Sequence, residues 1–450
     1  MVEGQARAKF IDGSTMRHVL VMTLTGALGI MALFLVDFFD LYFISQLKQT
    51  AMTAAIGYAG TIILFNISIG MGSSIAASAL VAHNLGSGSV DRAREYATNT
   101  LLTSLIISTL VTLTLVFGSG YFLSILGAEG ETNRIAQNFI WTMTPGFILV
   151  GGELCCAAIL RALGDARRAM YITLASAIVT LCFDPILIFG LDLGVQGAAI
   201  ATVLGYLTAF SIGFYSLIKT HRFLKPIELS KLVRDYPAIW AIAGPGILSQ
   251  LTLPFSNAYL THLIASYGDE AVAGFAIICR IIPVAYGVIF ALAGAVGPII
   301  GQNHGASNIH RVRRTLNDAL IFSTIYTLGA TIVLFMYRQE VVALFSVVGR
   351  TSDIILYFCK FIALSWIFVA AQFLASAAFN NLGYPKLSLY FNWGKATLGT
   401  IPFALLGSHI AGPEGILAGN AVGAVISGLA AIATVYWIVN RSKSADNLTN

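Results

Sequence analysis

Long apolar runs are the feature that most constrains what this chain can fold into. Hydrophobic residues make up 57% of its 450 residues and charged residues only 10%, whereas a soluble globular protein carries about 25% charged residues. Because so few polar side chains cannot cover a surface in water, we expect the chain to lie in a lipid bilayer. The net charge of +5 is small and gives no reason to expect nucleic acid as a partner.

A run of roughly 20 apolar residues is long enough to cross a bilayer as a helix. Breaks at charged or Gly/Pro-rich stretches separate twelve such runs, so we predict an all-α membrane protein with twelve transmembrane helices. Their predicted limits are 17–44, 54–82, 97–118, 135–160, 169–190, 197–218, 238–265, 271–300, 315–336, 354–381, 388–407 and 414–439.

The basic residues predict the orientation of these helices. Of the 26 lysines and arginines, most lie at the two termini and in the loops that follow even-numbered helices, and the opposite loops hold only Lys48, Arg134, Arg338 and Arg350. Because basic loops stay in the cytoplasm, we expect both termini there, in a multi-pass protein of the inner (plasma) membrane. No cleavage site follows the first run, so it is expected to remain as a span.

An internal repeat divides the chain. The segment VAHNLGSGSVDRAR from Val81 matches IGQNHGASNIHRVR from Ile300, and LGDARRAMY from Leu163 matches LGYPKLSLY from Leu382 at the same offset. We therefore predict two six-helix lobes, residues 1–220 and 221–450, related by a pseudo-two-fold axis along the membrane normal. In secondary transporters built in this way, the substrate site lies between the repeats and access alternates as they rock.

The acids inside the predicted spans are Asp37, Asp40, Glu153 and Asp184, and all four belong to the first lobe. An intramembrane charge costs about 2.5–3.5 kcal/mol on insertion scales, so each acid needs a reason. Their distribution predicts a cation or proton site in the N-terminal lobe.

Asp37 and Asp40 are three residues apart and share one helix face. Two carboxylates so close in a low dielectric rarely both ionise, so one holds a proton or a cation neutralises both. In a third interpretation, Asp40 lies near the outer end of its helix and reaches water.

A second cluster surrounds Asp184. Thr180 lies one turn before it, Pro185 loosens the helix and frees carbonyls, and Thr202 belongs to the next span. Carboxylate, hydroxyl and carbonyl oxygens suit sodium or a proton relay. We therefore take Asp184, with Thr180 and Thr202, as a candidate Na⁺ or proton site; a kinked helix with a hydrogen-bonded aspartate is the alternative.

Other polar residues are candidate supports for this site. Glu153 can either take part in the cation site or serve as a structural partner for an arginine. Arg280 lies too deep in its span to reach the interface easily. Lys360 and Lys395 lie nearer the ends of their spans and are expected to reach it. The five cysteines show no CxxC or Cys/His spacing, so we expect neither a disulfide framework nor a zinc site.

Several segments together resemble the multidrug and toxic compound extrusion (MATE) family, with the DinF-like prokaryotic branch most similar. They are DLYFISQL at 40–47, FDPILIFGLDLGVQGAAIAT at 183–202, GDEAVAGFAI at 268–277 and GPIIGQNHGA at 297–306. The resemblance places the family's N-lobe cation site on Asp40, Asp184 and Thr202. Three departures stand out: Thr180 replaces a frequent Asn, Leu41 a usual Thr, and Gln250 lies where another branch carries acids.

The resemblance implies a secondary exporter that exchanges H⁺ or Na⁺ for amphipathic, mostly cationic drugs and dyes by alternating access. We expect a monomer with no cofactor and no enzymatic activity, since no nucleophile–base pair is present. A flippase for lipid-linked precursors is the alternative, as is another twelve-helix secondary transporter. A major-facilitator protein is disfavoured because GSGSVDRAR lacks that family's glycine spacing.

Overall fold

The computed structural model describes residues 7–45 and 50–449, leaving out the side chains of residues 37, 38, 41, 42, 44, 45, 50–54 and 442–449. These residues divide into two compact units. Within the described residues, the first unit is built from 7–9 and Leu28–Gln250, and the second from Phe10–Ala27 together with 251–449.

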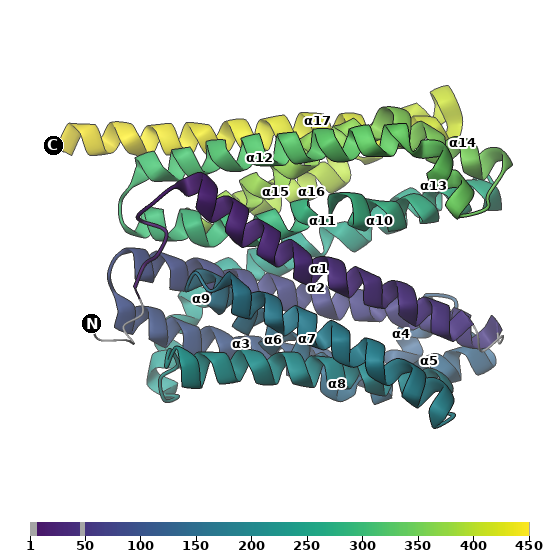
Figure 1. The fold of residues 1–450 in the computed structure, drawn as a ribbon, viewed down its shortest axis with the longest axis horizontal. Coiled ribbons are helices and arrows are strands. Elements are labelled where there is room, and N and C mark those ends of the chain that lie inside the picture. Colours follow the sequence, from purple (N-terminus) through teal and green to yellow (C-terminus); the bar gives the residue numbers. More distant parts are fainter. Residues whose placement is uncertain (1–6, 46–49, 450) are drawn as a thin grey trace. The chain divides into compact units, whose positions relative to one another are not determined.

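The first unit is a bundle of long helices that pack alongside one another (Figure 1). It contains the second part of α1 and the following elements: α2 (Thr50–Gly86), α3 (Val90–Phe117), α4 (Ser119–Ile125), α5 (Gly130–Thr142), α6 (Thr144–Ala162), α7 (Ala166–Pro185), the π-helix η1 (Ile186–Gly190), α8 (Gly194–Tyr215), the π-helix η2 (Ser216–Thr220) and α9 (Leu229–Gln250). The whole of α1 covers Thr15–Ser45.

The second unit has the same plan, and its long helices α11, α12, α15 and α17 also pack side by side (Figure 1). Its elements after α1 are α10 (Thr252–Ala265), α11 (Asp269–Gly305), α12 (Ile309–Met336), α13 (Arg338–Leu344), α14 (Gly349–Tyr357), η3 (Phe358–Ile362), η4 (Ala363–Ser365), α15 (Trp366–Asn381), α16 (Pro385–Gly394), η5 (Lys395–Gly399) and α17 (Ile401–Thr449).

The predicted membrane helices are confirmed. Among the described residues, 11 helical stretches are long and apolar enough to span a membrane. One of them, Pro385–Arg441, contains two spans because its backbone leaves the helical region at Ala411 and Gly412, where Gly412 has φ 60°. This break falls between the last two predicted spans, 388–407 and 414–439.

Glycines hold the two arms of this last hairpin together. A Cβ atom on Gly423 would collide with the backbone of Gly399, and one on Gly415 would collide with the backbone of Gly407. The pairs are nested around Gly412, so the arms run antiparallel and their backbones touch. Small residues allow the close backbone approach on which helix association in membranes depends.

The turn between α6 and α7 fixes where α7 begins. Gly164 has φ 72°, and Asp165 then caps α7 by accepting a hydrogen bond from the Arg168 amide at 3.1 Å. Burial alone would raise the pKa of Asp165, but hydrogen bonds from His221 and Arg168 outweigh it and hold that pKa well below its usual range. Asp165 therefore stays ionised and keeps α7 in register.

The compact units do not divide at residue 220, where the predicted lobes of residues 1–220 and 221–450 meet. Residues 221–250 belong to the first unit, and residues 10–27, which begin the sequence's first repeat, belong to the second. Ion pairs and hydrogen bonds at corresponding places in the two repeats account for this exchange.

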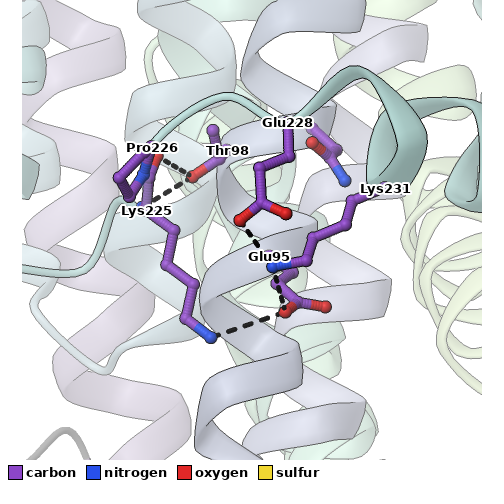
Figure 2. A pocket seen from close by; sticks show the side chains of 7 residues that line it. Glu95, Thr98, Lys225, Pro226, Glu228 and Lys231 are labelled. Carbon is purple, nitrogen blue, oxygen red and sulfur yellow. Dashed lines mark hydrogen bonds and ion pairs between the residues drawn. The ribbon is translucent and has the colours of Figure 1, made fainter.

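In the first unit, Arg92 holds the beginning of α9. Its guanidinium donates to both oxygens of Asp235 at 2.7 and 3.0 Å, and Asn99 donates to the same carboxylate at 2.8 Å. Figure 2 shows the neighbouring cluster, in which Lys225 and Lys231 each approach Glu95 at 3.5 Å. These contacts keep α9 on α3.

In the second unit, Arg311 occupies the repeat position of Arg92 and holds the segment before α1. It donates to the carbonyls of Phe10, Asp12 and Gly13 at 2.8, 3.0 and 2.9 Å. Asp318, the counterpart of Asn99, accepts a hydrogen bond from Thr15. We name these two sets of contacts, centred on Arg92 and Arg311, the arginine clamps.

Gly423→Ala should disrupt the last hairpin, because the added methyl group has no room against the Gly399 backbone. We expect loss of a monodisperse peak in size-exclusion chromatography of the detergent-solubilised protein. Gly329→Ala is the control, since a Cβ atom there meets nothing within 4 Å. A Gly423→Ala protein that behaves like this control would refute the tight packing.

Asp235→Ala should lower the free energy of unfolding by about 2 kcal/mol, because it removes several hydrogen bonds between charged groups. Glu228→Ala removes only a surface partner of Lys231 at 2.7 Å and should have an effect below about 1 kcal/mol. Thermal unfolding in detergent measures both. Equal melting temperatures for the two variants would contradict a structural role of the Arg92 clamp.

Candidate cation site

The second part of α1 packs along α7 in a defined register. A side chain on Gly29 would collide with the hydroxyl of Thr173, and the rings of Phe43 and Phe189 meet edge to face at 6.2 Å. The number of residues from Gly29 to Asp40 on α1 equals the number from Thr173 to Asp184 on α7. The two helices therefore run in the same direction, and their acids meet at one level.

Asp40 and Asp184 form a carboxyl pair at this level. Their side chains lie beside one another. Asp184 is 0% exposed, and neither of its oxygens has a hydrogen-bond partner among the residues that the structure describes; the same is true of Oδ1 of Asp40. Because buried polar atoms are nearly always hydrogen-bonded, these orphan oxygens call for a proton or a bound cation.

Helix α8 packs along α7 at this level. A Cβ atom on Gly205 would collide with the hydroxyl of Thr180, and one on Gly197 would lie 2.6 Å from the backbone of Leu187. On α8, Thr202 lies between these two glycines in the sequence. Asp184, on α7, lies between their two contacts, Thr180 and Leu187. The predicted partners Thr180 and Thr202 therefore lie within about a turn of the Asp184 level.

The hydroxyl groups differ in availability. Thr202 donates to the carbonyl of Ala198 at 3.0 Å, which leaves its oxygen lone pairs as acceptors. Thr180 is buried, and so is Ser176 one turn earlier. Sequence reasoning missed Ser176, although its spacing of four residues before Thr180 places it on the same face of α7.

The backbone beside Asp184 leaves the α-helical pattern, as Pro185 predicts. Pro185 has no N–H, so the carbonyl of Leu181 loses its helical donor. The helix continues as the π-helix η1, in which Leu191 donates to the carbonyl of Ile186 at 2.9 Å. Such π-helical turns are frequent at functional sites. Carboxylate, hydroxyl and carbonyl oxygens thus come together, a donor set that fits Na⁺ or a proton.

The remaining predicted residues lie apart from the carboxyl pair. Glu153 is buried on α6, and within the described chain it forms no ion pair with an arginine. Gln250 ends α9, with Nε2 3.7 Å from Sδ of Met71. Arg280 is exposed on α11 of the second unit. The side chain of Asp37 lies outside the described residues.

Comparisons with known proteins agree on one family. The MatE family model matches residues 27–186 and 245–406. A relative named FAD transporter from Shewanella oneidensis is 29% identical over 438 residues, which is 94% of each chain. The multidrug export protein MepA of Staphylococcus aureus is 24% identical over 406 residues, or 89% of each chain.

Solved structures show the same fold. A mutant of the Vibrio cholerae MATE transporter VcmN matches with a TM-score of 0.90 at 24% identity, over 95% of this chain and 97% of that one. A MOP superfamily transporter from Pyrococcus furiosus matches with a TM-score of 0.91 at 20% identity, over 98% of this chain and 99% of that one. The predicted all-α, twelve-helix, two-lobe fold class is thereby confirmed.

Asp184→Asn should leave the free energy of unfolding unchanged or raise it by about 1 kcal/mol, because the amide removes a buried charge whose oxygens lack partners. Asp192→Asn, an exposed loop substitution, is the control and should be neutral. Thermal unfolding in detergent without added sodium is the measurement. A marked loss of stability in Asp184→Asn alone would show that Asp184 is a structural residue.

Proposed function

Because the chain belongs to the MatE family of transporters, we propose that it is a secondary exporter that couples the efflux of organic compounds to the entry of H⁺ or Na⁺. The observation that carries the coupling is the pair of half-buried Asp40 and fully buried Asp184 with its orphan oxygens. The family accounts for export, and the pair accounts for the energy source. Transport, not catalysis, is the proposed activity.

The coupling follows from electrostatics. Two adjacent carboxylates in a low dielectric repel one another, so the pair favours states in which a proton or a cation reduces its charge. Asp40 is on α1, and Asp184 is on α7 just before the π-helix. Loading and emptying the pair therefore changes the force between these two helices. If the two access states differ in this contact, they differ in cation affinity, and a gradient shifts their populations.

Sodium and protons make different demands on this site. A proton needs one carboxyl oxygen, whereas sodium needs several oxygen ligands at once, which Thr180, Thr202 and the freed backbone carbonyl near Pro185 can supply. A variant that lacks one of these hydroxyl groups therefore distinguishes sodium coupling from proton coupling. Thr180→Val should weaken sodium-driven export more than proton-driven export.

For the substrate, we propose amphipathic, mostly cationic organic compounds. MepA is a multidrug export protein, and the acids of the first unit suit cations. The relative named FAD transporter supports a second class, aromatic compounds with phosphate groups. We place the protein in the inner (plasma) membrane, as a monomer with both termini in the cytoplasm, because the basic residues gather in the loops on that side.

Efflux by acid variants tests the coupling. In cells stripped of their own pumps, the wild type should raise tolerance to ethidium. In inside-out vesicles, an imposed pH or sodium gradient should drive ethidium uptake. Asp40→Asn and Asp184→Asn should abolish this uptake, because the amide cannot exchange a proton, and Asp37→Asn should weaken it or shift its pH optimum.

Asp192→Asn, expressed to the same level, is the matched control. Wild-type uptake by both Asp40→Asn and Asp184→Asn would remove the carboxyl pair from the mechanism. A dead Asp37→Asn beside a normal Asp40→Asn would reassign the switch to Asp37. Uptake that responds to neither gradient in the wild type would refute the antiporter itself.

A further inference from the structure

A cavity of about 300 Å³ lies within the second unit, in the hairpin formed by α16, η5 and α17. Its lining includes Tyr390, Phe391, Lys395, Phe403 and Ser427. This volume is at the lower end of the range for small-molecule sites, which are mostly apolar with a few polar groups. Lys395 supplies the one positive charge in the lining.

Lys395 lies deep in its span. It follows Pro385, the first residue of α16, by ten residues, which is about 15 Å along a helix. That is about half of a hydrocarbon core of roughly 30 Å. That Lys395 reaches the interface stays a prediction, and a lysine at such a distance from the start of its span is a functional candidate by default.

The ammonium group of Lys395 has no counter-ion nearby. Within the described part of the chain, no carboxylate lies within ion-pair distance of its Nζ atom. The cavity lining contains no acid, and Ser427 is committed to Gln372, to which its hydroxyl donates at 2.7 Å. Lys395 is half-buried, and a partly desolvated cation beside an apolar cavity is stabilised by an anionic group that enters the cavity.

The repeat strengthens this interpretation. Lys395 corresponds to Ser176, and Phe403 corresponds to Asp184. In the second unit, the aromatic residue Phe403, which lines the cavity, thus stands where the first unit has the buried acid. Two turns earlier, Lys395 stands where the first unit has a serine. Matching helices of the two units therefore carry opposite charges at neighbouring levels.

We propose that this cavity binds an organic anion among the exported compounds, with its carboxylate or phosphate on Nζ of Lys395 and its aromatic part against Tyr390, Phe391 and Phe403. The proposal rests on the proposed export function and assigns a binding site to its second substrate class, aromatic compounds with phosphate groups.

Equilibrium dialysis of the detergent-solubilised full-length protein tests the site. Riboflavin 5′-phosphate and riboflavin share one ring system and differ in a phosphate group, so their comparison isolates the anion. We expect the wild type to bind the phosphate about tenfold more tightly. Lys395→Met, which keeps the length but removes the charge, should abolish this difference, and Lys395→Arg should retain it.

Lys360→Met is the matched control, because Lys360 is an exposed lysine of the same unit outside the cavity lining. Equal binding of both flavins by the wild type would overturn the proposal. So would a phosphate preference that survives Lys395→Met, or one that Lys360→Met also removes. Dialysis needs no gradient, so its failure leaves the export proposal intact, whereas absent ethidium export leaves the dialysis result valid.

Discussion

The arginine clamps determine how the two units are assembled from one chain. A guanidinium group offers five donors in a rigid fork, so it can hold a carboxylate or several carbonyls at once. Arg92 uses this fork on Asp235 and Arg311 uses it on the backbone of residues 10–13. Each clamp retains the beginning of the other repeat's first helix. As a result, α1 is divided between the two units after Ala27, and the chain passes from the first unit to the second between α9 and α10.

Against this shared scaffold, the two repeats have diverged in their charged residues. The first unit retains a carboxyl pair whose oxygens lack partners, and the second has a lysine beside an apolar cavity. Both are costly in a bilayer, where a charge without a partner costs several kcal/mol. The hairpin glycines and the glycines of α8, by contrast, perform only packing, and they bring the backbones of α8 and α17 close to the elements that carry these groups, α7 and η5.

Much of the fold could be predicted from apolar run length and the repeat, because a bilayer permits few alternatives to a helix. The Pro185 break and the Asp184–Thr180–Thr202 grouping were also predictable, since both follow from local sequence. The pairing of Asp40 with Asp184 depends on the register between α1 and α7, which Gly29 and Thr173 set across distant segments. The extent of the compact units likewise depends on contacts between distant segments, and a side-chain contact such as Arg311 with Phe10 leaves no periodic signal.

The clamp on residues 10–13 also orders the protein's biosynthesis. The Arg92 clamp can form as soon as α9 has emerged from the ribosome, because Arg92 and Asp235 have then both been synthesised. Arg311 is synthesised about 300 residues after Phe10, so the leading segment must wait through most of translation before its partner exists. At roughly 5–20 residues per second, that delay lasts tens of seconds. Insertion machinery or a chaperone has that interval in which to shield the unclamped helix.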